Sequence, residues 1–421
     1  MKFAFITPRY GADIASGAEH ACRLLAEHVA GHHDVDVLTT CARDPRTWKN
    51  VYAEGTDRVR GVVVRRFAVG QRHDREAFLH LCDRMRDDPR SRSDELEWVH
   101  RLGPSSPGLL DFLGRQHRSY DALVFCSLEH ATTVDGVRVV PGRSVVLPCL
   151  QVRPTLRFGL WADVLSSVAA VALVSDAERP ILSAYVGVRP RVAELVGIGI
   201  DPPPQLAYPR HQQDPADAVL PEDQEALDGS DGPEPWYRTG RGMTFRRRHR
   251  LYGSFALYGG RVEPDNGCEE MLEYFDSYAA QDEPLPLVLM GVKMMRVPDL
   301  AHVSLAGVLP DRERMAAYEA ADVTIAPSPD DLLAQATLES FAVGTPVLAS
   351  ARNAAAVEHC RRANAGLVYA DRHEFAEALR MLAGRDRLRE ALGENGRNYV
   401  RQHFRWDHVV SRFERLVTKV R

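Results

Sequence analysis

The strongest constraint on the fold lies between residues 321 and 350, where two apolar strands flank one loop and one short helix. The loop carries two adjacent carboxylates, Asp330 and Asp331, and Gly344 ends the helix that follows. The apolar run at residues 347–349 is typical of a strand that is buried on both faces of a parallel sheet. The stretch therefore predicts an α/β unit in which a loop leads directly into a helix N-terminus.

Free backbone N–H groups at that helix start, including those of Leu332 and Leu333, form a natural site for a phosphate group. Glu339 lies two turns further along, where its carboxylate can accept hydrogen bonds from a pair of sugar hydroxyls. The alternative is an ordinary loop–helix–strand unit in which Asp331 only caps the helix. These residues alone leave both interpretations open.

The N-terminal residues predict a second unit of the same kind. Residues 3–7 form a short apolar run, and a loop containing Gly11 leads into an amphipathic helix that ends at Gly31. Ser16 and Glu19 have the spacing of a capping box at the start of that helix. In open α/β sheets, ligands bind at such loops, at the carboxyl ends of the strands. The loop lacks the G-x-G-x-x-G pattern, so it gives little support to a dinucleotide site.

Composition limits the class of protein. A chain of 421 residues is long enough for two domains, and 45% hydrophobic with 26% charged residues is typical of soluble globular proteins. The net charge of -5 argues against a nucleic-acid partner, which would require a concentrated basic surface. Seven scattered cysteines without a zinc-type pair indicate a reduced, cytoplasmic protein. We find no apolar segment long enough for a signal peptide or a transmembrane span.

The composition changes between residues 202 and 242, where prolines, glycines and acidic residues dominate and apolar residues show no period. We expect an interdomain insertion there. The basic run at residues 245–250 either contacts an anionic ligand or forms a solvated edge that pairs with the acidic run before it. We favour the solvated edge.

The second half opens with an apolar strand at residues 255–258, and Gly259, Gly260 and Arg261 follow it directly. An arginine at such a turn can bind an anionic group.

Taken together, these motifs resemble the retaining glycosyltransferases of family 4, which have the GT-B fold. The resemblance rests on the Gly-Gly-Arg turn at residues 259–261, on Asp331 and Glu339 eight positions apart, and on the Gly-Thr-Pro run at 344–346. It implies an α/β fold with two Rossmann-like domains that face each other across a cleft. The implied parts are an N-terminal acceptor domain (1–201), an insertion or linker (202–250), a C-terminal nucleotide-sugar domain (251–403) and a C-terminal helix (404–421) that crosses back to the first domain.

The resemblance also assigns roles to residues. It places a glycine against the donor's phosphate and sugar, two loops around its base, cations and backbone N–H groups at its diphosphate, and a glutamate at its ribose. The implied donor-binding residues are Gly11, Arg261, Asn266, Gly291, Val308, Leu309, Leu332, Leu333 and Glu339, and the implied catalytic residues are Arg261, Asp331 and Gln151.

Three of these positions depart from the family pattern. Gln151 stands where the family commonly has His near the reacting sugar, Asn266 where it has Lys, and Asp331 where it usually has Glu. Gln151 does not titrate and Asn266 carries no charge, so a hydroxyl acceptor would receive less help than usual. A sulfur acceptor would suffer less, because sulfur is nucleophilic without a strong base. S-glycosyl transfer is therefore a minority hypothesis beside O-transfer.

The implied function is the transfer, with retention, of a sugar from a UDP- or GDP-type donor to a small-molecule acceptor in specialised biosynthesis. No metal or further cofactor is expected. The alternatives are a catalytically silent partner or activator of another transferase and, more weakly, a sugar-nucleotide epimerase. Retention of Arg261 and Glu339 favours the enzyme. The sequence leaves open the base, the sugar, the acceptor and whether the chain forms a homodimer.

Overall fold

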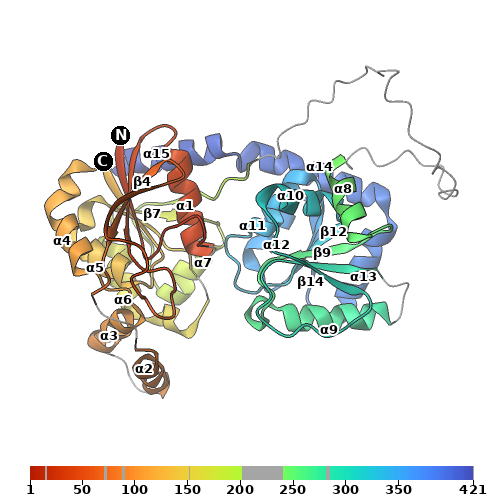
Figure 1. Cartoon of the computed structure of the whole chain (residues 1–421), viewed down its shortest axis with the longest axis horizontal. Helices are drawn as coiled ribbons and strands as arrows, with labels where there is room; N and C mark the ends of the chain where they lie inside the picture. Colours follow the sequence, from red (N-terminus) through yellow and green to blue (C-terminus); the bar gives the residue numbers. More distant parts are fainter. Residues whose placement is uncertain are drawn as a thin grey trace.

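The computed structural model describes residues 1–14, 17–70, 74–87, 91–150, 152–201, 240–280 and 285–420. Gln151, Ser16 and most of the expected 202–242 insertion lie outside these residues. Two sheets, each covered by helices, lie side by side (Figure 1). The predicted α/β fold with two Rossmann-like domains is confirmed.

The first domain contains an eight-stranded sheet with the strand order β3-β4-β2-β1-β5-β6-β7-β8. Neighbouring strands are parallel, except that the edge strand β3, which we did not expect from the sequence, pairs antiparallel with β4. Residues 3–6 of β1 are fully buried, as their apolar run predicts. The strands are β1 (Lys2–Thr7), β2 (Asp34–Thr40), β3 (Gly55–Val59), β4 (Val62–Phe67), β5 (Ala122–Cys126), β6 (Ser144–Leu147), β7 (Ala170–Leu173) and β8 (Ala193–Leu195).

Helices cover both faces of this sheet. One face packs against α1 and against α15 from the end of the chain, and the other packs against the helices between β4 and β7. The helices of this domain are α1 (Gly17–Val29), α2 (Arg75–Asp87), α3 (Arg92–Leu102), α4 (Pro107–Gln116), α5 (Ala131–Val139), α6 (Gly159–Ser167) and α7 (Glu178–Ile181).

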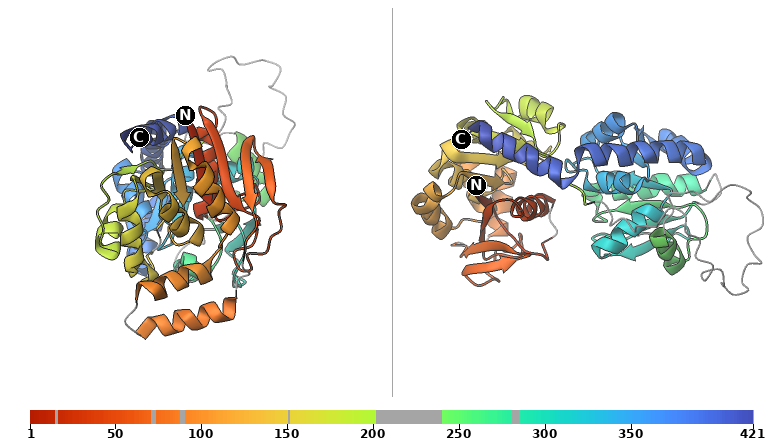
Figure 2. Two further views of the ribbon diagram at one scale, coloured as in Figure 1. Left: turned by 90° about the vertical axis from the view of Figure 1, so that its left-hand side faces the viewer. Right: turned by 90° about the horizontal axis from the view of Figure 1, so that it is seen from above.

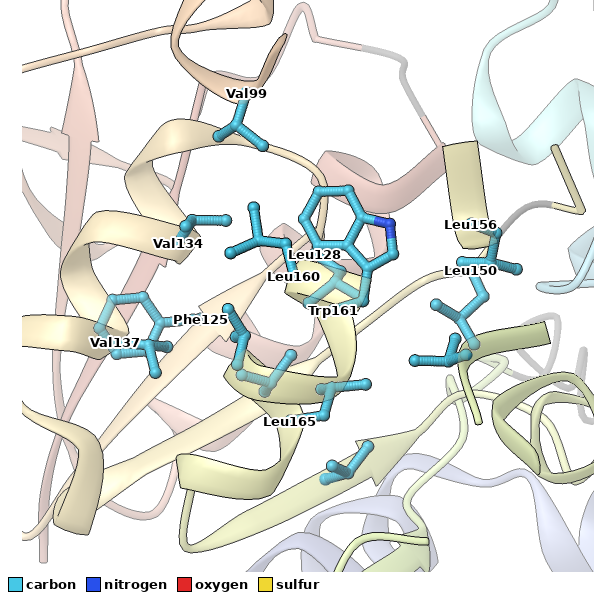
Figure 3. Close-up of a cluster of buried hydrophobic side chains, with 14 of the residues drawn as sticks. Val99, Phe125, Leu128, Val134, Val137, Leu150, Leu156, Leu160, Trp161 and Leu165 are labelled. Carbon is cyan, nitrogen blue, oxygen red and sulfur yellow. The ribbon is translucent and has the colours of Figure 1, made fainter. Parts of the chain in front are cut away.

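The core beneath the first sheet holds the loop that follows β6. Figure 3 shows Trp161 of α6 among the leucine side chains of this core, with Leu150 and Leu156 beside it. Leu150 is 3% and Leu156 is 1% exposed, and Trp161 Nε1 donates to the Thr155 carbonyl oxygen at 2.7 Å. The segment that contains position 151 is therefore anchored in the core on both sides.

The second domain contains a six-stranded parallel sheet with the order β11-β10-β9-β12-β13-β14. Its strands are β9 (Ala256–Gly259), β10 (Leu287–Met290), β11 (Val303–Gly307), β12 (Val323–Ala326), β13 (Val347–Ser350) and β14 (Gly366–Tyr369). Its helices are α8 (Gly240–His249), α9 (Cys268–Ala279), α10 (Asp311–Ala320), α11 (Gln335–Val343), α12 (Ala354–Ala363), α13 (Arg372–Gly384) and α14 (Asp386–His403).

The basic run at residues 245–250 forms the second half of α8, which packs against α10 in the second domain. Arg247, Arg248 and Arg250 are exposed, as expected of a solvated edge, whereas Arg246 is buried. The acidic run that was expected to pair with this edge lies outside the described residues. Arg246 is 7% exposed, and its Nη2 lies 3.0 Å from Oδ2 of the buried Asp322. A charge at this depth requires a buried partner, and the composition of the run gave no sign of one.

The last helix, α15 (Trp406–Val420), returns to the first domain (Figure 2). Phe413 lies edge-on to Phe3 with ring centroids 5.3 Å apart, and Trp406 stacks on His28 at 3.7 Å. The chain thus crosses between the domains twice, once after β8 and once between α14 and α15. Among the described helices, none is both long and apolar enough to cross a membrane.

Candidate functional site

The two domains meet where the loops after β1 and β12 lead into α1 and α11. A Cβ atom on Gly17, the first residue of α1, would lie 3.3 Å from Leu333 Cδ1. Gln335 Nε2, at the start of α11, lies 3.4 Å from His20 Nε2. The buried Leu332 also joins the core cluster of the first domain. The carboxyl ends of both sheets therefore face one junction, as binding sites in open α/β folds require.

Helix α11 starts later than the sequence indicated. Ala334 has a left-handed φ of 45°, and the helix begins only at Gln335. The Leu332 N–H already donates to the Asp330 carbonyl oxygen at 3.1 Å, and the Leu333 N–H bonds to the Asp331 carboxylate. The first-turn N–H groups without an intrahelical acceptor are instead those of residues 335–337. These N–H groups are available to an anion, and an anion contact at Leu332 and Leu333 stays a prediction.

Asp331 holds the loop before α11 in place. Its Oδ1 accepts the Ala334 N–H at 3.0 Å. Burial raises the pKa of Asp331, although the two backbone N–H groups act in the opposite direction. Asp331 does not cap α11, because the N-cap residue is Ala334 and no side chain bonds to the first turn of the helix. A contact between Asp331 and a donor sugar stays a prediction.

Glu339 is buried and its carboxylate already accepts three hydrogen bonds. Arg314 on α10 donates from Nε to Oε2 at 3.1 Å and from Nη2 to Oε1 at 3.0 Å, and Gln335 Nε2 donates to Oε1 at 2.9 Å. Sequence reasoning missed Arg314, which lies 25 residues away in the chain. No spacing rule connects residues so far apart, so only the packing of α10 on α11 identifies this pair.

His20 completes this network from the first domain. Its Nδ1 lies 3.1 Å from Arg23 Nη2. Burial lowers the pKa of His20 to about 4, and the positive charges of Arg23 and Arg314 lower it further. The imidazole is therefore neutral at physiological pH, and the junction carries no additional positive charge from it.

The turn after β9 presents Arg261 to solvent. The Arg261 side chain is 56% exposed, and its Nη2 lies 2.9 Å from Glu263 Oε1. Asn266 Nδ2 donates to the Arg261 carbonyl oxygen at 2.9 Å, while Ser328 Oγ is 3.5 Å from Asn266 Oδ1. Asn266 thus links this turn to the loop before α11, a structural role that a lysine would not fill in the same way.

The expected base-binding loops lie at the ends of β10 and β11. Gly291 has a φ of 135°, and a Cβ atom on it would overlap the carbonyl oxygen of Gly260, so this turn requires glycine. Val308 is 70% exposed and Val292 is 42% exposed, whereas Leu309 is partly buried against the core. Exposed apolar side chains of this kind offer a surface on which a flat ring can pack.

Two titratable groups that the sequence analysis did not identify lie after β5, near the loop that contains position 151. Glu129, after β5, accepts a hydrogen bond from Thr155 Oγ1 at 3.1 Å. Burial raises the pKa of Glu129, and the charge of Arg153 opposes the rise. The adjacent His130 has its pKa lowered to about 4 by burial. A carboxyl from a neighbouring strand end therefore reaches the loop that contains position 151.

The loop after β1 is filled by its own side chains. A Cβ atom on Gly11 would lie 2.8 Å from Asp13 Oδ1 and 2.9 Å from Tyr52 Oη. The Glu19 carboxylate pairs with Arg9 Nε at 2.7 Å and with Arg9 Nη2 at 3.0 Å, and the expected capping box with Ser16 lies outside the described residues. The glycine that lies against the second domain is Gly17, and Gly11 as a donor contact stays a prediction.

Across the described ranges, histidine, cysteine, aspartate and glutamate side chains form no group that could hold a metal ion. The polar groups at the junction are instead guanidinium groups, helix N–H groups and carboxylates. Such a set suits the binding of an anionic, hydroxyl-bearing ligand.

Comparisons with known sequences identify the second domain. The family model described as "Glycosyl transferases group 1" matches residues 245–399. A D-inositol 3-phosphate glycosyltransferase of Jonesia denitrificans is 28% identical over 179 residues, which are 38% of this chain and 41% of that enzyme. The match thus spans less than half of the length of this curated relative.

Solved structures match the whole chain in fold. Sucrose-phosphate synthase from Thermosynechococcus elongatus aligns with a TM-score of 0.64 and 17% identity, over 99% of this chain and 98% of its own. Anabaena HepE in complex with UDP and glucose aligns with a TM-score of 0.66 and 14% identity, over 99% of both chains. Residues 245–399 of this chain thus match the family model of the glycosyl transferases group 1, and the two domains together have the GT-B fold.

Proposed function

We propose that this protein is a retaining glycosyltransferase, which moves a sugar from a UDP- or GDP-activated donor to a small-molecule acceptor. The observation that carries the proposal is the junction itself. Helix α11 carries Glu339, and its N-terminus contacts α1 of the first domain. Arg261 lies in the turn after β9, which Asn266 links to the loop before α11.

Each part has a chemical task in this scheme. The N–H groups at residues 335–337 and the Arg261 guanidinium bind the diphosphate and stabilise the charge that it gains as the glycosidic bond breaks. Glu339 binds the ribose, and Asp331 lies beside the hydroxyls of the donor sugar. The acceptor attacks from the face that the leaving phosphate vacates, and its proton passes to a basic oxygen beside it. In this scheme, protein cations and helix N–H groups bind the diphosphate, and no metal ion is required.

Relatives support the choice of donor class. Anabaena HepE was solved with UDP-glucose, and the E. coli trehalose-6-phosphate protein was solved with UDP-2-fluoro glucose. These proteins are 13% and 11% identical to this chain, so they suggest candidates for the first ligands to test.

The second candidate function is a catalytically silent partner of another transferase. Two observations favour this alternative. The Glu339 carboxylate already accepts three hydrogen bonds, and the Asp331 carboxylate accepts a hydrogen bond from the backbone. Both groups are thereby satisfied without a ligand.

The test is a calorimetric titration of the full chain with UDP, GDP, ADP and TDP. The proposed enzyme binds one of them tightly and, with the matching sugar donor and an acceptor, releases the free diphosphate. Absence of binding to all four would favour the silent partner.

A further inference from the structure

The Glu339 carboxylate has room for one more hydrogen bond. A carboxylate offers about four acceptor positions on its two oxygens. Arg314 Nη2 and Gln335 Nε2 occupy Oε1, while Arg314 Nε occupies one position on Oε2. The position that remains is on Oε2. A ribose diol therefore cannot donate both of its hydroxyl protons to Glu339 as the carboxylate is held.

Arg314 has hydrogens to spare beside this carboxylate. Its guanidinium carries five N–H hydrogens in a fixed plane. Two point to Glu339 and one points from Nη1 to Asp311, a side chain that is 74% exposed. Two hydrogens on Nη1 and Nη2 are left, and the Arg314 side chain is itself 29% exposed. The pair thus offers one acceptor and up to two donors next to each other.

A pair of vicinal hydroxyls fits one free acceptor beside up to two free donors, because each hydroxyl can both donate and accept a hydrogen bond. We propose that Arg314 and Glu339 recognise the ribose jointly, with one hydroxyl donating to Glu339 Oε2 and its neighbour accepting from the Arg314 guanidinium. This inference rests on the proposed function, since it assigns the ribose of the donor to this pair. It makes Arg314 a determinant of selectivity for ribonucleotides over 2′-deoxyribonucleotides.

The physical reason for that selectivity is the cost of an unpaired polar group. A 2′-deoxyribose has one hydroxyl at this place, so either the remaining acceptor of Glu339 or the donors of Arg314 lose their partner. Sites built to bind a hydroxyl reject analogues that lack it far more strongly than apolar pockets reject a missing methylene. If Arg314 were only a structural partner of Glu339, its loss would change stability without changing this discrimination.

The experiment uses the full chain and two matched nucleotide pairs, UDP with 2′-deoxy-UDP and GDP with 2′-deoxy-GDP. Calorimetry measures both members of each pair on the wild type, on Arg314→Gln and on Arg314→Lys. Arg312→Gln is the control, because Arg312 is an exposed arginine on the same helix. Thermal unfolding of every variant checks that the fold is kept.

We expect the wild type and Arg312→Gln to bind the ribonucleotide about 10- to 100-fold more tightly than its 2′-deoxy counterpart. In Arg314→Gln this preference falls below about threefold, and Arg314→Lys, which keeps the charge but not the planar fork, is intermediate.

Two results overturn the inference while leaving the proposed function intact: equal binding of both members of a pair by the wild type, or an unchanged preference in Arg314→Gln. If the wild type binds none of the four nucleotides, the proposed function and this inference both fail.

Discussion

Glu178 and Leu150 are joined by a buried hydrogen bond, in which the Leu150 N–H donates to Glu178 Oε1 at 3.0 Å. The other carboxylate oxygen accepts the Val174 N–H at 2.8 Å, and Glu178 is fully buried. One side chain thus holds the loops after β6 and β7 together. Because Leu150 directly precedes position 151, this bond fixes the chain on one side of that position.

The Glu178 carboxyl also makes the free energy of unfolding depend on pH. Burial raises the pKa of Glu178 to about 7 from the usual 4.5, although three backbone N–H groups oppose the shift. Between these values the folded state binds more protons than the unfolded chain. The contribution of protonated Glu178 to the free energy of unfolding is therefore complete below about pH 4.5. This contribution is lost as the pH rises to about 7. We expect the stability advantage of the wild type over Glu178→Gln to fall by about 3 kcal/mol between pH 4.5 and pH 8.

Denaturant unfolding of both proteins at several pH values measures this difference. Glu269→Gln, which removes an exposed carboxyl of α9, is the control for the loss of one acidic group. A difference between wild type and Glu178→Gln that stays constant or grows with pH would contradict the prediction.

Asp322→Ala should destabilise the second domain strongly. Asp322 is 3% exposed, and its Oδ2 accepts hydrogen bonds from Arg246 Nη2 at 3.0 Å and from the Phe255 N–H at 2.9 Å. Removing one partner of a buried ion pair leaves the other charge uncompensated, at a cost of about 3–5 kcal/mol. Thermal and denaturant unfolding measure the loss.

The control is an exposed ion pair that also involves α8. Arg248 of α8 and Glu313 of α10 also form an ion pair, but their side chains are 58% and 40% exposed. Glu313→Ala should therefore cost less than about 1 kcal/mol. Similar losses in the two variants would show that burial does not set the strength of the pair that anchors α8.

Local pattern was sufficient to predict the architecture. The fully apolar runs, the glycines at helix ends and the alternation of strands with helices depend on neighbours in the chain, so they indicated the parallel sheets and the loops at the strand ends. The antiparallel edge strand β3 was not predicted, because it is mostly exposed and polar, with the sequence GTDRV.

Side-chain pairing was the part that local pattern did not reveal. Arg314 and Glu339 lie 25 residues apart, and Glu129 reaches Thr155 from another strand end. The late start of α11 depends on the left-handed Ala334, a conformation that alanine seldom adopts and that no residue preference indicates. Each of these features is imposed by tertiary packing.

Glu339→Ala should weaken binding of the nucleoside diphosphate by about 1.5–3 kcal/mol, because it removes a charge-assisted hydrogen bond to the ribose. The Arg314 guanidinium also loses its partner on α11. Calorimetry measures the affinity, and thermal unfolding shows whether the variant is folded. Unchanged affinity in a folded variant would place the ribose elsewhere.

Arg261→Ala should act mainly on turnover. The Arg261 side chain is 56% exposed in the structure, and its charge matters most as the diphosphate leaves. We expect kcat to fall by about 100-fold or more, with a smaller change in donor affinity. Steady-state kinetics separate the two effects, and Arg247→Ala on the exposed side of α8 is the control. If turnover survived and only donor affinity fell, Arg261 would be an anchor for the ground state.

The last prediction concerns the acceptor atom. The Glu129 carboxyl accepts a hydrogen bond from Thr155, which lies close to position 151 in the chain, and burial raises its pKa. We propose that this carboxyl acts as the base that position 151 does not provide. We therefore expect the wild type to prefer a hydroxyl acceptor to a thiol of the same structure.

Glu129→Gln tests the reason for that preference. A hydroxyl needs help with its proton as it attacks, so its kcat should fall by about 100-fold or more, which is the usual contribution of a general base. The matched thiol is nucleophilic without that help and should lose far less. Competition assays with both acceptors on the wild type and the variant decide the matter. A wild type that prefers the thiol would revive S-glycosyl transfer, and equal losses with both acceptors would show that Glu129 only supports the loop through Thr155.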